Sequence, residues 1–333
     1  MSRICLYYRP LRETDRWVRG DRHVRPLVRR LVRGPERGGV PAVFANLRRG
    51  LDRLGQQYVI NPPFRALRAD DRVGVLGRGR DCLAGYDRPN PIVAGIALMT
   101  HPSEWPTLCD EYPVVTYLQH SQWAADVYRP YFGDRCKVWP VGIDTHRWRP
   151  SPARKSVDFL VYEKFLWEHE AHRQRVLEPA LAVLRSRGLT YELLRCGTYT
   201  PREYAAMLAR ARAMLFLSPH ESQGIAYQEC LSSGVPVLAW DQRACLDPNR
   251  FAWGTPVISA TSVPYFDERC GMRFSSAGDL PETLDAFLDA MRGGRFAPRD
   301  YVLETLTLER GATEFVRHLD EAMSPAPAAE ALV

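Results

Sequence analysis

The chain has 333 residues, of which 45% are hydrophobic and 11% aromatic, so it is globular and long enough for two domains that each bury a core. No apolar run approaches the ~20 residues of a membrane-spanning helix, and the apolar part of the amino terminus is too short to predict a signal peptide. The net charge of +6 is modest but uneven, because residues 1–80 contain 19 arginines, no lysine and only seven acids.

The amino-terminal region begins with a predicted strand at residues 4–8 and continues into an arginine-rich stretch at residues 9–37. Apolar residues are interspersed among these arginines, so the stretch either includes a basic amphipathic helix or is a solvated loop and helix face. A basic region of this kind suits an anionic acceptor or a membrane surface.

The eight cysteines are scattered along the chain and include no Cys-x-x-Cys pair. Several fall in predicted strands or helices, which favours buried thiols over a disulfide or zinc framework. We therefore expect a cytoplasmic protein, at the inner face of the membrane if the basic stretch contacts lipid.

The rest of the first half reads as buried strands joined by helices and loops. Gly39 precedes an amphipathic helical pattern that ends at Gly55, and His120 lies between a predicted strand and a predicted helix. Further strands are predicted at 58–61, 73–76, within 91–100, and at 114–118. The polar, proline-rich residues 151–155 predict a domain boundary near residue 150.

The second half alternates strands and helices. Strands are predicted at 157–162, 191–195, 214–217, 235–239, 263–266 and 272–274, and helices after 164, at 201–211, 221–231, 280–292 and 305–323. Such alternation predicts a parallel sheet, which binds ligands at the carboxyl ends of its strands.

Two carboxylates bracket the predicted helix at 221–231. Glu229 lies eight positions after Glu221, with seven residues between them, which in a helix is a rise of about 12 Å, too far for the two to share a proton or a metal. The backbone N–H groups of Gln223, Gly224 and Ile225 lie between them at the helix start, where an anion is favoured. A phosphate site between two hydroxyl-binding carboxylates suits a nucleotide-sugar. The alternative is that both glutamates are ordinary helix carboxylates.

This stretch resembles the Glu-x7-Glu element of the retaining GT-B glycosyltransferases of group 1, the family 4 class. The matching residues are Glu221-Ser222-Gln223-Gly224, Glu229-Cys230 and Ser233-Gly234-Val235-Pro236-Val237, with Ser222 in place of the family's first glycine. The resemblance implies an α/β fold with two Rossmann-like parallel-sheet domains that face each other across a cleft. It divides the chain into an acceptor-binding domain at 1–150, a nucleotide-sugar-binding domain at 151–303, a helix at 304–323 that returns to the first domain, and a flexible tail at 324–333.

The resemblance also implies roles for individual residues. His120 would face the reacting sugar, and Gly39 would lie in the loop against the donor. Lys164 stands where related enzymes have the arginine that holds the donor diphosphate, with His169 at the position of their lysine and Arg173 one turn further on. In the same way Glu221 would hold the donor sugar, Glu229 the ribose, and Tyr199 the nucleobase. Structural roles remain the alternative for His120, Lys164 and Tyr199.

The implied function is transfer of a sugar from a nucleotide-diphosphate-sugar donor to an acceptor hydroxyl with retention of configuration. No Asp-x-Asp motif is present, and we expect neither a metal nor another cofactor. The acceptor would be a glycan, a glycolipid or a small molecule, and nucleic acid is not expected as a partner. One alternative keeps the fold but makes the chain a nucleotide-sugar epimerase or a phosphorylase-like GT-B protein. A second is an arginine-rich polyanion-binding protein on an inactive scaffold, which would bind nucleic acid with a steep salt dependence.

Overall fold

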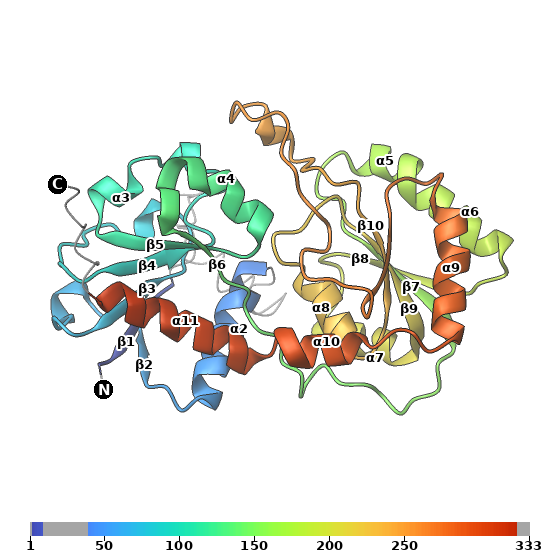
Figure 1. Ribbon diagram of the computed structural model, residues 1–333, viewed down its shortest axis with the longest axis horizontal. Helices are drawn as coiled ribbons and strands as arrows, with labels where there is room; N and C mark the ends of the chain where they lie inside the picture. Colours follow the sequence, from blue (N-terminus) through green and yellow to red (C-terminus); the bar gives the residue numbers. More distant parts are fainter. Residues whose placement is uncertain (1, 9–38, 325–333) are drawn as a thin grey trace, which may run out of the picture. The chain divides into compact units, whose positions relative to one another are not determined.

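The computed structural model describes residues 2–8 and 39–324 (Figure 1). The arginine-rich stretch at 9–37 and the tail beyond residue 324 lie outside these residues. The chain forms two compact units. Unit 1 comprises the described residues up to Gln119, then Tyr128–Trp139 and the residues from Ala312 onward, and unit 2 comprises His120–Val127 and Pro140–Gly311.

Unit 1 is built on a six-stranded sheet in the order β2-β1-β3-β4-β5-β6, and every strand pair in it is parallel. Its strands are β1 (Ile4–Tyr7), β2 (Tyr58–Ile60), β3 (Arg72–Val75), β4 (Ile92–Gly95), β5 (Val114–Gln119) and β6 (Cys136–Val138). Because β1 and β4 are buried along their whole length, they are continuous apolar runs in the sequence rather than alternating patterns.

The helices of unit 1 are α2 (Gly39–Arg53) and the short α3 (Leu108–Glu111), while α4 (Gln122–Phe132) and α11 (Leu308–Met323) each contain residues of both units. Short 3-10 turns at Phe64–Ala66, Arg80–Cys82, Pro102–Glu104 and Gly133–Arg135 complete the connections. The side chain of Phe315 on α11 packs so closely on β3 that a Cβ at Gly74 would lie 2.8 Å from its ring.

Unit 2 contains a five-stranded sheet in the order β11-β10-β9-β7-β8, again all parallel. The strands are β7 (Val157–Glu163), β8 (Tyr191–Arg195), β9 (Ala211–Leu217), β10 (Val237–Trp240) and β11 (Gly271–Phe274). Its helices are α5 (His169–His172), which continues through a π-helical turn at Arg173–Leu177 into α6 (Glu178–Ser186), then α7 (Pro201–Arg210), α8 (Ile225–Ser232), α9 (Leu280–Arg292) and α10 (Pro298–Thr305).

Both faces of the unit 2 sheet are covered by apolar side chains. Along β9, Met214 and Phe216 pack into the core that contains α7 and α8, whereas Leu215 and Leu217 pack into the core that contains α6 and α9. A parallel sheet buried on both faces places its strand ends, rather than its faces, within reach of a ligand.

The α/β fold with two parallel sheets confirms the predicted fold class. Two local predictions were wrong. Residues 263–266 do not form a strand, and the helix predicted at 221–231 begins four residues later, at Ile225. The change of unit between Trp139 and Pro140 lies about ten residues before the boundary that the linker composition suggested.

All eight cysteines are free, and only Cys109 and Cys196 are partly exposed, whereas the other six are buried. Within residues 2–8 and 39–324, no helix combines the length and the apolar character needed to cross a bilayer.

Candidate functional site

Lys164 and Glu221 meet at the carboxyl ends of two neighbouring strands of unit 2. Lys164 directly follows β7, and its backbone N–H donates to the carbonyl of Leu217, the last residue of β9, over 2.9 Å. Its Nζ lies 2.6 Å from Oε2 of Glu221. The second carboxylate oxygen accepts a 2.9 Å hydrogen bond from Oγ of Ser218. The pairing of β7 with β9 therefore positions Lys164, and Ser218, directly after β9, positions the carboxylate of Glu221.

This ion pair is largely withdrawn from solvent, since the Glu221 side chain is 7% exposed and the Lys164 side chain 25%. Burial lowers the pKa of Lys164, but the charge of Glu221 and the hydrogen bond between them outweigh burial, so the pKa lies above its usual value. Lys164 is therefore a permanent cation at physiological pH.

The start of α8 is set by a single glycine. Gly224 has a left-handed backbone (φ 82°, ψ 49°), and a Cβ there would lie 2.1 Å from the ring of Tyr227, so only glycine fits. Because this conformation is not helical, Glu221 lies in the loop before the helix and not in its first turn. The helical spacing that the sequence suggested between Glu221 and Glu229 therefore does not apply. Ser222 in the same loop is exposed.

The side chain of Gln223 is buried and serves the structure of this loop. Its Nε2 donates to the carbonyl of Val141 over 2.6 Å, and its Oε1 accepts from the N–H of Val141 over 2.9 Å. The Gln228 side chain donates to the carbonyl of Gln223 over 2.8 Å. The predicted donor contact at this position is the backbone N–H, which these side-chain bonds do not involve.

Glu229 and Tyr199 lie on the same side of the unit 2 sheet. Glu229 is half-buried on α8, about one turn from its start, and Tyr199 is half-buried in the loop before α7. The Tyr199 hydroxyl pairs with that of Tyr162 at 2.7 Å. Burial raises the pKa of Tyr199, and the charges of Glu229 and Glu221 act in the same direction. The three predicted donor residues are thus close enough to interact electrostatically.

The two basic residues considered as a second cation beside Lys164 are each paired with a carboxylate. His169 binds the buried carboxylate of Glu163, and Arg173 forms an ion pair with Glu178 at 2.6 Å. Each of these basic groups has an acidic partner in its own segment. Lys164 is paired with a carboxylate as well, but its partner, Glu221, is itself predicted to bind the donor.

His120 is buried and belongs to unit 2, together with the seven residues that follow it. Its carbonyl accepts a 2.5 Å hydrogen bond from the hydroxyl of Tyr265. In the same segment, the indole N–H of Trp123 donates to the carbonyl of Glu221 over 2.9 Å. Two hydrogen bonds thus connect the segment with the residues around Glu221. Gly39, by contrast, begins α2 in the amino-terminal region.

No family model matches the chain, and no curated protein matches it. Solved structures do. A glycosyltransferase from Rickettsia africae aligns over 98% of this chain and 100% of its own, with a TM-score of 0.58 and 11% identity. Sucrose-phosphate synthase from Thermosynechococcus elongatus aligns over 96% and 99%, with a TM-score of 0.53 and 12% identity. TarM from S. aureus, crystallised with UDP and α-GlcNAc-glycerol, aligns over 76% of this chain but 56% of its own, with a TM-score of 0.55 and 11% identity.

The chain has the GT-B fold. It spans little more than half the length of TarM and 58% of the length of the chain matched in the GtfA/B complex. At these identities the likeness establishes the fold alone.

One residue of the candidate site was not predicted from the sequence. His220, next to Glu221, stacks on Trp167 at 5.6 Å and meets the edge of Trp123. Its Nδ1 accepts from the N–H of Leu246 over 3.2 Å. Burial, together with the charges of Lys164 and Arg250, lowers its pKa to about 4. Its position directly after the buried strand was a usable signal, but the two tryptophans are distant in sequence.

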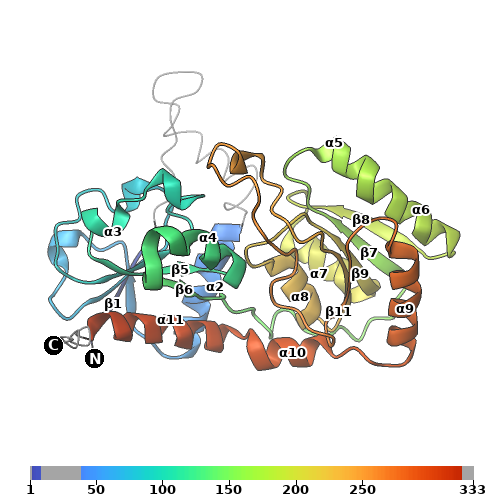
Figure 2. The same ribbon diagram turned by 45° about the horizontal axis from the view of Figure 1, so that its top comes forward.

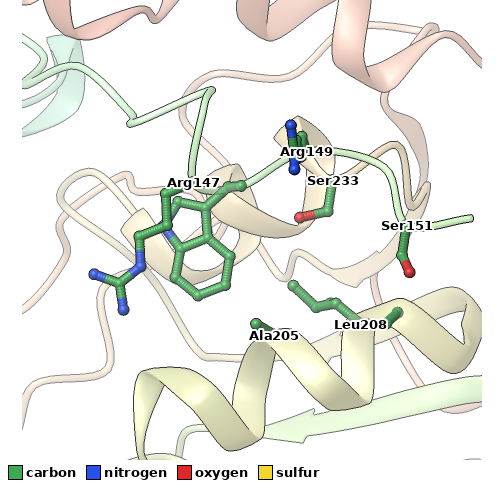
Figure 3. A pocket seen from close by; sticks show the side chains of 8 residues that line it. Arg147, Arg149, Ser151, Ala205, Leu208 and Ser233 are labelled. Carbon is green, nitrogen blue, oxygen red and sulfur yellow. The ribbon is translucent and has the colours of Figure 1, made fainter.

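A small pocket of the GT-B chain lies away from these residues. Figure 3 shows its lining side chains, which include Arg149, Ser151, Leu208 and Ser233. Ser233 directly follows α8, whereas the predicted donor residues surround the start of that helix. Eight helical residues separate the two ends by about 12 Å, so this pocket does not belong to the candidate site.

Proposed function

We propose that the chain is a glycosyltransferase that moves a sugar from a nucleotide-diphosphate-sugar donor to an acceptor hydroxyl. The observation that carries the proposal is the meeting of Lys164 and Glu221 at the carboxyl ends of β7 and β9, at 2.6 Å. In a parallel sheet this is the edge where ligands bind. The GT-B fold, shared with the glycosyltransferases named above, supports the same reading.

The diphosphate would lie between Lys164 and the start of α8. The first N–H groups of a helix have no partner within it, so those of Gly224 and Ile225 are available to an anion, and the N–H of Gln223, in the loop just before α8, would join them. Glu221 orients the ammonium group and would in turn bind the hydroxyls of the donor sugar. These groups are fixed before the donor arrives, which is the condition for strong stabilisation of a leaving group.

The remaining roles follow the positions of the side chains. Glu229 would accept hydrogen bonds from the ribose hydroxyls, as acidic residues do in dinucleotide-binding folds, and Tyr199 would pack on the nucleobase. Ser222 would narrow the approach to the donor sugar. His120 would face the reacting sugar, and Gly39 would contact the donor from unit 1.

The bond that breaks joins the anomeric carbon to a phosphate oxygen of the diphosphate. We propose retention at that carbon, with the departing phosphate accepting the proton of the attacking hydroxyl. Lys164 and the helix N–H groups would carry the developing charge of the leaving group, so the reaction would need no metal, and a chelator would leave the rate unchanged. The acceptor would be a glycan, a glycolipid or a small molecule, and the site of action the cytoplasm.

A thermal-shift panel of nucleoside diphosphates tests the class of ligand and names the base together. We expect one base to raise the melting temperature, since a ligand that binds the folded state stabilises it. Titration of three variants then tests the residues. Glu229→Ala should raise the dissociation constant about tenfold or more, because a charged hydrogen-bond acceptor is lost. Lys164→Ala should mainly slow turnover, by about 100-fold. Lys137→Ala, which replaces the exposed lysine of β6, is the matched lysine control.

If Glu229→Ala and Lys164→Ala both bind nucleoside diphosphate like the wild type, the site assignment is wrong. Incubation of donor without acceptor separates the proposal from an epimerase, which would isomerise the sugar. A phosphorylase would instead require inorganic phosphate.

A further inference from the structure

The connection between β10 and β11 in unit 2 contains a long projection over residues 242–260. In Figures 1 and 2 it is the orange segment that extends from the sheet and carries a short helical turn, Pro248–Arg250. None of the residues proposed to bind the donor lies on it. The proposed binding of the donor therefore places no requirement on the side chains of this projection.

The projection is held in shape along its whole length. At its base, Oδ2 of the buried Asp241 accepts from Oγ1 of Thr261 over 2.8 Å, and Oδ1 accepts from the N–H of Ser262 over 3.1 Å. Further out, Ala244 and Ser259 form an antiparallel bridge. At the tip, Nε of Arg250 donates to the carbonyl of Pro256 over 3.2 Å and Nη1 to that of Asp247 over 2.8 Å. The tip is thus a built structure, closed by one guanidinium group.

This tip exposes apolar side chains to an unusual degree. Val257 is 87% exposed and Phe251 is 64% exposed, the two highest values among the large hydrophobic residues of the described ranges. The Arg250 bridge to Pro256 brings the two to the same end of the projection. Ala252 and Pro256 between them are exposed as well. Folding leaves this apolar surface in water, at a cost that a partner would remove.

Residues 242–260 carry a net positive charge. Asp247 is the only acid in residues 242–260, and it is buried, where its carboxylate caps the helical turn by accepting from the N–H of Asn249. Arg250 contacts two backbone carbonyls and lies 4.3 Å over the Phe251 ring. Its charge therefore remains available to an external anion, next to the apolar tip. Arg243, lower on the projection, is also exposed.

We propose that this tip inserts into the interfacial region of an anionic bilayer, with Phe251 and Val257 among the acyl chains and Arg250 at the headgroups. An apolar tip beside a basic group is the pattern that binds such interfaces. A protein partner fits less well, because a stable protein interface needs roughly 800 Å² on each side, and a narrow convex tip offers a few side chains. The proposal does not depend on the glycosyltransferase function.

Flotation of the full chain with phosphatidylcholine vesicles, with and without phosphatidylglycerol, tests the proposal. We expect the wild type to bind the anionic vesicles and salt to weaken this binding. We expect an association constant about tenfold lower for the double variant Phe251→Ser, Val257→Ser. The control is Leu303→Ser, which removes a partly exposed leucine of α10, 42% exposed, and should bind like the wild type. Residues 9–37 are present in every protein compared, so the difference reports the tip alone.

The double variant should keep the melting temperature of the wild type, since the substituted side chains are exposed. Hydrogen exchange should slow at residues 249–257 when anionic vesicles are added. The proposal is overturned if the wild type does not float with anionic vesicles, or if the double variant floats equally well. It is also overturned if the double variant abolishes self-association or capture of another protein while vesicle binding persists.

Discussion

The ion pair between Lys164 and Glu221 should show strong energetic coupling in a double-mutant cycle. Lys164→Met leaves the carboxylate of Glu221, 7% exposed, with the hydroxyl of Ser218 as its remaining side-chain partner among residues 2–8 and 39–324. Removing one member of a fully buried pair costs about 3–5 kcal/mol. Since a quarter of the lysine side chain reaches solvent, we expect the lower end, about 3 kcal/mol.

The reverse substitution should cost less. Glu221→Gln keeps the shape and the hydrogen bond from Ser218, and it leaves a cation that can turn to water, so we expect about 1.5 kcal/mol. The double variant removes both charges and should lose about 2 kcal/mol. The coupling, the sum of the single losses minus that of the double variant, is then about 2.5 kcal/mol.

Hydrogen exchange of the β9 amides measures these losses in unit 2 without requiring that the whole chain unfold in one step. The control cycle is Arg187→Met with Asp285→Asn, an exposed pair at 2.8 Å between α6 and α9, which should show no measurable coupling. A coupling for Lys164 and Glu221 as small as that of the control would refute the buried pair. Because the pKa of Lys164 is raised, the pair stabilises the protein below the unfolded value of 10.5 and is lost as pH rises through the higher folded value.

Three further predictions concern the loop before α8. The pKa of His220 is lowered to about 4 from 6.5, so its neutral form is favoured in the folded chain, and stability should fall by about 3 kcal/mol as pH drops from 7 to 4. His220→Asn should flatten that part of a urea-unfolding pH profile, and an unchanged slope would contradict the lowered pKa. Gly224→Ala should lose about 2–4 kcal/mol from the left-handed backbone and the clash with Tyr227. Gly188→Ala, with φ 67° and no neighbour within 4 Å, should lose only the backbone part, and equal losses would exclude the clash. Gln223→Leu should cost about 2–4 kcal/mol in thermal unfolding, because it leaves buried backbone groups without partners. A loss below about 1 kcal/mol would mean that water reaches them.

The alternation of buried strands and helices was sufficient to predict the fold. Strands such as β7 and β9 are apolar runs bounded by polar turns, and a parallel sheet buried on both faces produces that signal. The start of α8 was not predictable in the same way. Its position depends on the left-handed backbone of Gly224 beside the ring of Tyr227, which is a tertiary contact that helical periodicity does not record.

In the candidate site, too, some features were predictable from the sequence and others depend on tertiary contacts. Glu221 and Lys164 were identified from their positions after strands, but their direct contact depends on the pairing of β7 with β9 and could not be deduced from residue types. The prediction for Gln223 concerned its backbone N–H, and nothing in the sequence indicated that its side chain binds Val141, 82 positions away in the chain. A buried glutamine amide and an exposed one have the same local sequence pattern, so only the folded structure distinguishes them.

The two partly exposed thiols allow the wild-type chain to be labelled with fluorescent dyes. Cys109 belongs to unit 1 and Cys196 to unit 2, and both are partly exposed, whereas the other six thiols are buried. Burial raises the pKa of Cys109 as well as that of Cys5, Cys136 and Cys270, so access to the sulfur, rather than its pKa, distinguishes the two thiols that a dye would reach. A maleimide donor and acceptor dye on the two accessible thiols would place one label in each unit of the wild-type chain. Because Cys196 follows β8 and its N–H donates to the carbonyl of Glu163, its label would also stand one strand away from Lys164. Energy transfer between the dyes would then report any change in the distance between the two labels when a nucleotide is added, without an engineered substitution.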